Sequence, residues 1–460
     1  MKKLRHFLAS IAGRKPVEKD NVPLFPASAS VVRSLAGKLI TFNDNGAWCW
    51  YQDPRAVVDV TNGKIIVGSV AAPEGPNGKK RRGNVEAAIY DITTGVCKVV
   101  VLHERLQADD HNAPAFFIRP DGRYLAVYTK HNCEKRAYWR ISTRPHDADN
   151  WEPEKTFSLA GRIGKSRITY SNLHFLSAEK RLYNFLRGIN HDPTIMISVD
   201  DGNTFSYAGK LFTKTLIGYS NAYVKYASNG VDRIDLICTE HHPRDFNNSI
   251  YHGFIRGGKL HTSDGSVTDG NVFSDQGRSQ THLTRVFAAD SVWNGETMTH
   301  AWTTDLRLDQ NGHPVALITC RANDMPENSA YNDHRFFYAR WDGRQWIVHP
   351  VAKAGPCLWR REEDYTGLGS IHPHHPDTLY LSTPIDPRDE APLAHHEIFK
   401  GVTKNGGASW QWMPVTENSG VDNLRPYIPV WDAEHTAVIW FCGTMTASQH
   451  YHTAMVGIIE

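Results

Sequence analysis

Long apolar runs are missing from this chain of 460 residues. No run approaches the roughly 18 consecutive apolar residues that a membrane-spanning helix needs, so no membrane partner is expected. An excess of charge is missing too: the formal net charge is +2, and nothing indicates a nucleic acid as partner. The seven cysteines are an odd number without regular spacing, which excludes a disulfide scaffold and favours free thiols or metal ligands.

Long segments with the 3.6-residue period of a helix are almost absent as well. Short apolar runs separated by turn dipeptides take their place, as where residues 56–60 turn at Asn62-Gly63 into residues 64–68. Repeated hairpins without helices between them predict an all-β fold, either a propeller or a large sandwich. About seven blades of roughly 50–60 residues would use the chain, and a closed ring hides strand edges, so a seven-bladed β-propeller is expected.

No Pro-, Gly- or Ser-rich linker divides the chain. A single propeller domain is therefore expected over residues 35–460, with the last strand, around residues 453–459, helping to close the ring. Residues 1–34 are expected to form an N-terminal extension with a basic start and a short apolar run. That run is short for a signal peptide, so the extension is either a weak export signal or an arm on the domain.

Two histidines converge at the open end of one predicted hairpin. Its strands are residues 115–118 and 124–128, and Asp121-Gly122 forms the turn between them. Folding the chain at that turn brings His111 and His131 within a residue or two of being opposite each other. A single imidazole would more often cap a strand, but two beside a pair of aspartates indicate a functional site.

A second hairpin brings a phenol to a guanidinium. Its turn is centred between Ala178 and Glu179, which places Tyr170 directly opposite Arg187. Since a guanidinium stabilises a phenolate, we expect the pKa of Tyr170 to lie below its usual value and its hydroxyl to carry a proton in catalysis. The alternative is an exposed cross-strand cation–π pair.

Five separated motifs resemble the BNR-4 repeat family. They lie at residues 46–57, 110–115, 169–172, 242–245 and 422–426. The resemblance implies a seven-bladed propeller, and the family's characterised members include polysaccharide lyases, notably ulvan lyases, with two His, one Tyr and one Arg in a groove across the propeller. The matching catalytic positions in this sequence are His111, His131, Tyr170 and Arg187, which the hairpin argument also brings together.

A uronic-acid lyase removes the C5 proton, α to the carboxylate, and expels the 4-linked sugar oxygen by β-elimination. Such a site must neutralise the carboxylate and supply a base and an acid. Arg187, helped by His131, suits the carboxylate; His111 would then be the base and Tyr170 the acid, unless Tyr170 does both. The expected substrate is an acidic, ulvan-like polysaccharide, sulfated or not, which favours a secreted or periplasmic protein. No organic cofactor is expected, and the oligomeric state stays open.

Two further functions remain open. The turns at residues 198–205 and 403–410 resemble the Asp box of sialidase-like propellers, which suggests a sialidase-like glycoside hydrolase, although no clean arginine-triad spacing is found. A non-catalytic carbohydrate-binding propeller is the other alternative.

Further substrate-binding residues are expected within or near the family motifs. These are Asn112, Asn247, Tyr251, His252, Asn423 and Arg425. Trp48 and Trp50 either stack on sugar rings or fill the core, and we favour the core for at least one of them.

Two cysteines and two histidines suit a structural Zn²⁺ ion. The predicted ligands are Cys320, His334, His349 and Cys357, because a hairpin folded at Asp342-Gly343 would bring the two histidines to one end. Four protein ligands in a tetrahedral set are typical of a structural rather than a catalytic zinc site.

Overall fold

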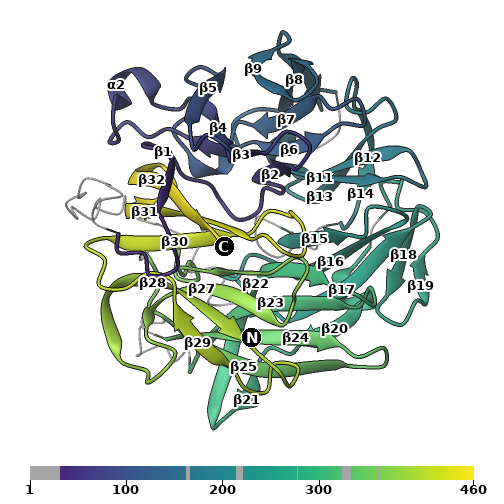
Figure 1. The fold of residues 1–460 in the computed structure, drawn as a ribbon. Coiled ribbons are helices and arrows are strands. Elements are labelled where there is room, and N and C mark those ends of the chain that lie inside the picture. Colours follow the sequence, from purple (N-terminus) through teal and green to yellow (C-terminus); the bar gives the residue numbers. More distant parts are fainter. Residues whose placement is uncertain (1–31, 162–165, 214–220, 277, 324–332, 360–361) are drawn as a thin grey trace, which may run out of the picture.

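A computed structural model describes residues 32–161, 166–213, 221–276, 278–323, 333–359 and 362–460. Seven antiparallel sheets stand in a ring (Figure 1), so the chain is an all-β, seven-bladed propeller, as the sequence predicts. Most of the predicted N-terminal extension, residues 1–31, lies outside the described residues. Among the helices of the described part, none is long and apolar enough to span a membrane.

Six blades follow one another along the chain. The first contains β2 (Ala56–Asp59), β3 (Lys64–Val70), β4 (Val85–Asp91) and β5 (Cys97–His103). The second contains β6 (Ala115–Ile118), β7 (Tyr124–Thr129), β8 (Arg136–Arg144), β9 (Asp147–Trp151) and β10 (Lys155–Ser158). The third contains β11 (Ser166–Leu176), β12 (Arg181–Ile189), β13 (Pro193–Ser198) and β14 (Ser206–Lys210). The fourth contains β15 (Val224–Ser228), β16 (Arg233–Thr239), β17 (Ile250–Arg256), β18 (Lys259–Thr262), β19 (Val267–Asp269) and β20 (Thr284–Phe287). The fifth and sixth contain β21 (Ser291–Trp293), β22 (Glu296–Leu308), β23 (Pro314–Ala322), β24 (His334–Trp341) and β25 (Trp346–Gly355); and β26 (Gly369–Ile371), β27 (Thr378–Ile385), β28 (Pro392–Val402) and β29 (Gln411–Pro414).

The seventh blade joins the two ends of the described chain. It contains β30 (Asp422–Tyr427), β31 (Ala437–Ala447) and β32 (His450–Ile459), and its outer strand is β1 (Ile40–Asn43). β1 pairs antiparallel with β32, with Ile40 opposite Gly457. The last strand therefore helps to close the ring, as expected, by backbone hydrogen bonds to the beginning of the propeller.

Only short helical turns interrupt the strands of the described chain. They are α2 (Gly78–Arg81), η2 (Asp110–Asn112) and η3 (Gln280–His282). The β6–β7 hairpin begins directly after η2, which therefore sits at the entrance of the second blade.

The two Asp-box turns lie between the last two strands of their blades, β13–β14 and β28–β29. In the first, the Ser198 hydroxyl accepts the backbone N–H of Gly202 at 2.8 Å, and the Asp200 carboxylate accepts that of Thr204 at 2.9 Å. The second repeats both bonds, from Gly407 to the Thr403 hydroxyl and from Ser409 to the Asn405 amide oxygen. The side chains thus fold each turn locally.

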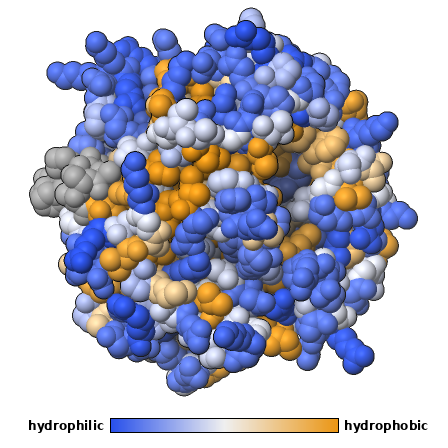
Figure 2. All heavy atoms as spheres, viewed as in Figure 1, coloured by the Kyte–Doolittle hydropathy of each residue, from blue (hydrophilic) through white to orange (hydrophobic). Residues whose placement is uncertain are grey.

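The centre of the ring is filled by aromatic side chains. Trp48 and Trp50 are both buried, at 0 % and 2 % exposure, which confirms the core interpretation for them. The Trp50 ring lies 4.9 Å from the rings of both Trp302, in the fifth blade, and Tyr365, in the segment that leads into the sixth. Figure 2 shows hydrophilic side chains over much of the rim of one face and hydrophobic ones gathered closer to its centre.

Ring closure by β1 makes Phe42 a test of stability. Its side chain is 1 % exposed and belongs to the central core, whereas the neighbouring Thr41 is exposed. Phe42→Ala should lower the free energy of unfolding by about 3–5 kcal/mol, because it leaves a cavity where the ring closes. Denaturant unfolding measures this, with Thr41→Ala as the control. Equal effects of the two substitutions would contradict a stabilising role for the closing strand.

Candidate functional site

The β6–β7 hairpin brings His111 and His131 together as predicted. Ala115 pairs with Val127 in the hairpin, and the same register continued outward places the two histidines opposite each other. Their imidazole rings stack with centroids 3.9 Å apart and planes 11° from parallel. The Asn112 amide oxygen accepts the backbone N–H of His131 at 2.7 Å, which holds the second histidine against the turn that carries the first.

A buried carboxylate that the sequence analysis did not single out joins the two imidazoles. Asp109 is fully buried, and its Oδ1 and Oδ2 atoms lie 2.7 Å from Nδ1 of His111 and of His131. Asp109 also caps η2, because Oδ1 accepts the backbone N–H of His111 at 3.0 Å. With Nδ1–H of each ring donated to the carboxylate, Nε2 of each ring is left for other partners.

The imidazoles therefore differ in proton affinity. Burial lowers the pKa of His111, but the Cys49 thiol and the carboxylates of Asp110 and Asp109 outweigh it and hold that pKa well above its usual value. Burial and then repulsion by His111 lower the pKa of His131. Burial also opposes the charge of Asp109, yet His131 and His111 keep its pKa low. The cluster thus carries one ionised carboxylate, one charged imidazole and one neutral imidazole.

Tyr170 reaches this cluster from a bulge in β11. Thr169, not Tyr170, pairs with Arg187, because the register of β11 against β12 shifts on both sides of Thr169; the prediction of a direct cross-strand pair is wrong by one residue. Tyr170 has a left-handed φ of 70°, which is strained for a tyrosine. The bulge turns its ring to 5.1 Å from the Arg187 guanidinium carbon and 5.5 Å from the His111 ring.

The predicted fall in the pKa of Tyr170 is also wrong. Tyr170 is 6 % exposed, and burial, followed by the nearby Tyr223 hydroxyl, raises its pKa well above 10.0. Arg187 acts in the expected direction but is outweighed. The phenol therefore stays protonated at neutral pH and is suited to donating a proton rather than to removing one.

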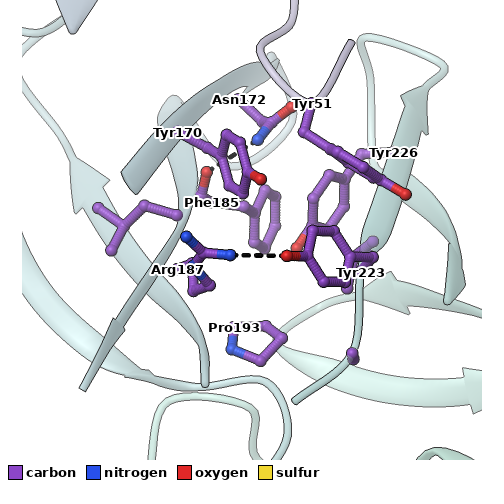
Figure 3. A pocket seen from close by; sticks show the side chains of 11 residues that line it. Tyr51, Tyr170, Asn172, Phe185, Arg187, Pro193, Tyr223 and Tyr226 are labelled. Atoms are coloured by element: carbon purple, nitrogen blue, oxygen red, sulfur yellow. Dashed lines mark hydrogen bonds between the residues drawn. The ribbon is translucent and has the colours of Figure 1, made fainter. Parts of the chain in front are cut away.

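Arg187 connects the cluster to a small cavity (Figure 3). Its Nη1 donates to the Tyr223 hydroxyl at 2.8 Å, and its Nη2 lies 3.4 Å from Nε2 of His131. Tyr51 and Tyr226 line the same cavity, whose volume of about 20 Å³ suits a single water molecule rather than a sugar ring.

His131 is the member of the cluster most open to solvent. Its side chain is 21 % exposed, whereas those of His111 and Asp109 are 5 % and 0 % exposed. A substrate would thus approach along the His131 edge.

Fully buried residues among the predicted substrate contacts have structural roles instead. Asn112 holds His131, as described, and His252 lies between Asp235 and Ser263, 3.0 and 2.7 Å from their side-chain oxygens. Asn423 accepts the indole N–H of Trp440 at 2.8 Å and donates to Ser419 at 3.0 Å. Their prediction as sugar ligands is wrong, because their hydrogen-bonding groups already have protein partners.

The other three predicted contacts also interact with other parts of the protein. Arg425 is 1 % exposed and pairs with the buried Asp110, which corrects its assignment to substrate binding. Tyr251 is 9 % exposed and packs in the core between the third and fourth blades. Asn247 donates to Asp290 at 2.8 Å and accepts the backbone N–H of His300 at 2.9 Å, so its amide braces two loops.

The predicted zinc ligands do not come together. In the β24–β25 hairpin, His334 pairs with Gly355 and His349 with Tyr338, so the two histidines lie at different levels along the strands. The Cys320 thiol contacts the Met298 sulfur instead, at 3.6 Å, and Cys357 follows β25. The prediction assumed a regular hairpin, whereas the register of β24 against β25 shifts twice near His334. Zinc ligation by these four residues is therefore wrong.

One group of metal-binding side chains does converge within the described ranges. It consists of Asp109, His111 and His131, with one ligand atom from each within 4.8 Å of the others. Both Nδ1 atoms already face the Asp109 carboxylate at hydrogen-bond distance, so the three side chains satisfy one another without an ion.

Comparisons with known proteins agree with this fold. No curated protein matches the chain. An ulvan lyase of polysaccharide lyase family PL25, solved bound to -[GlcA(1-4)Rha3S]-, has a TM-score of 0.64 and 15 % sequence identity over 91 % of this chain and 95 % of its own. The polysaccharide lyase Uly1 has a TM-score of 0.55 and 11 % identity over 95 % of this chain and 100 % of its own. A family model described as "BNR repeat-containing family member" matches residues 70–354, more than half of the sequence, and the chain therefore belongs to this BNR_4 family.

Proposed function

We propose that this protein is a polysaccharide lyase that cleaves an acidic, uronic-acid-containing, ulvan-like polysaccharide by β-elimination. The observation that carries the proposal is the convergence of His111, His131, Tyr170 and Arg187 in one cluster built on Asp109. The fold shared with an ulvan lyase and with the lyase Uly1 supports it. The enzyme would be secreted or periplasmic, where such a polymer is found.

The first task in this reaction is to neutralise the uronate carboxylate. Arg187 keeps a permanent positive charge and presents planar N–H groups that suit a carboxylate. Nε2 of His131 lies 3.4 Å from Nη2 of Arg187, on the most exposed side of the cluster, and can accept a hydrogen bond that orients the guanidinium toward the same carboxylate. Charge that develops beside the carboxylate during proton removal is then stabilised by groups already in place.

The second task is proton transfer, and we assign it to His111 and Tyr170. His111 would take the C5 proton once its imidazole is neutral, with Asp109 stabilising the imidazolium that forms. Tyr170, whose pKa burial raises, would donate its proton to the leaving sugar oxygen. A single Tyr170 acting as both base and acid is less favourable, because that role begins from a phenolate in a buried site.

The products identify the reaction class. Incubation with ulvan and other uronate-containing polysaccharides should release fragments with a new C4–C5 double bond, which absorbs in the far ultraviolet. New reducing ends without this absorbance would instead show a glycoside hydrolase. Glycan binding without any new ends would show a non-catalytic propeller, and either result would overturn the proposal.

Tyr170→Phe removes only the hydroxyl of the proposed acid. Turnover should fall by roughly two orders of magnitude or more with an unchanged fold, because the leaving oxygen loses its proton donor. Tyr226→Phe is the matched control, since Tyr226 lines the same cavity but has no role in the proposed mechanism. Near-normal turnover in Tyr170→Phe would remove Tyr170 from the mechanism.

The pH dependence follows from the base being neutral when it acts. Burial lowers the pKa of His111, but the Cys49 thiol and the carboxylates of Asp110 and Asp109 together raise it above 6.5, so kcat/KM should increase with pH through a midpoint above 6.5. Burial raises the pKa of Tyr170 above 10.0, so no loss from its ionisation is expected below that pH. A pH series of kcat/KM measures both limbs. A midpoint below 6.5 would contradict His111 as the base.

A further inference from the structure

A buried ion pair joins the seventh blade to the turn that carries His111. Nη1 of Arg425, in β30, lies 2.6 Å from Oδ2 of Asp110, in η2, and both side chains are 0 % exposed. The second oxygen of Asp110 lies 2.6 Å from Nδ1 of His111. We infer that Arg425 is a positioning residue that acts on His111 through Asp110.

The backbone of β30 is bent to deliver this guanidinium. Arg425 has a left-handed φ of 53°, and the pairing of β30 with β31 shifts register between Leu424 and Tyr427. Its backbone N–H donates at 2.9 Å to the carbonyl of Gly367, which precedes the sixth blade. A strained non-glycine residue persists only where its surroundings hold it in place.

The guanidinium itself has little freedom. It donates to the carbonyl of Trp48 as well as to Asp110, and its carbon lies 5.1 Å from the Trp50 ring and 5.6 Å from the Phe441 ring. Asp110 is thereby held at a fixed distance from His111. The contact between Asp110 Oδ1 and His111 is electrostatic rather than an aligned hydrogen bond, because Nδ1–H points to Asp109.

The negative charge of Asp110 is therefore shared between the Arg425 guanidinium and the His111 imidazole. Removing a positive charge from a buried carboxylate leaves that carboxylate free to stabilise another cation, here the His111 imidazolium. The titratable groups that face His111 are Asp109 and Asp110 on its own turn, His131 after β7, Tyr170 in β11 and Cys49 before β2, with His242 and Glu362 farther away. Among these, Asp110 is the group that Arg425 contacts.

NMR titration of the His111 imidazole in the full-length protein tests the inference. Arg425→Met should raise the titration midpoint of His111 by about one pH unit, because Asp110 is no longer shared with a guanidinium. Asp110→Asn should lower it, and the double variant should return it toward the wild-type value. This readout needs no turnover. The inference rests on the proposed function only in taking His111 as the catalytic base, so the titration can support or overturn it whatever the activity assays show.

Arg307→Met is the matched control. Arg307 is a partly buried arginine with an aspartate partner, Asp305, and its described partners do not include Asp110, so the midpoint of His111 should not change. The double variant leaves no unpaired charge and is expected to fold even if Arg425→Met does not. In that case Arg425→Gln, which keeps a donor for Asp110, should show the same direction of shift.

Two results would overturn the inference. One is a wild-type midpoint of His111 in a folded Arg425→Met or Arg425→Gln protein. The other is an Asp110→Asn protein, folded by circular dichroism, in which the midpoint is unchanged or raised.

Discussion

The propeller depends on one largely buried segment, residues 46–53, at the centre of the ring. Blade after blade holds it by hydrogen bonds or aromatic contacts. The partners lie in five blades and in the segments that lead into the second and sixth blades; they are Val70, Asp110, Ser171, Lys225, Thr303, Tyr365, Arg425 and Thr453. Since its polar backbone groups are buried, each needs a partner. The ring therefore cannot close around this segment without fixing the geometry at its centre, and the candidate site is built directly on that centre.

Burial, rather than charge alone, sets the chemistry of the cluster. Tyr170 shows this best: a guanidinium 5.1 Å from the ring is not enough to lower its pKa, because the desolvation of a buried phenolate is larger. The two imidazoles show the same competition with opposite results. Cys49 and the two neighbouring carboxylates outweigh burial and raise the pKa of His111, whereas burial and the His111 imidazolium together lower that of His131. One aspartate, Asp109, thus contacts both a charged and a neutral imidazole, whose ring centroids are 3.9 Å apart.

Local patterns predicted what depends on local geometry. The Asp-Gly turn gave the pairing of His111 with His131, because a hairpin without irregularities keeps its register to its open end. The same argument failed by one residue at Tyr170, where β11 bulges, and failed more widely at His334, where the pairing of β24 with β25 shifts twice. Bulges leave little trace in one sequence. Asp109 could have been found as the residue that caps the turn before His111, whereas the pairing of Arg425 with Asp110, 315 positions apart, depends on ring closure.

The strained residues show how one backbone device serves several purposes. Left-handed φ values recur where the chain enters the inner strands of consecutive blades, at Tyr170, Ala222, His300, Leu368 and Arg425. Strain is often taken as a sign of function, yet its repetition around the ring identifies the bend as a feature of the propeller. Function then depends on which side chain the bend carries. At one position it carries the proposed acid, at another the arginine that pairs with Asp110, and at Leu368 it carries a core side chain. The same backbone bend therefore carries a different side chain, with a different role, in each of these blades.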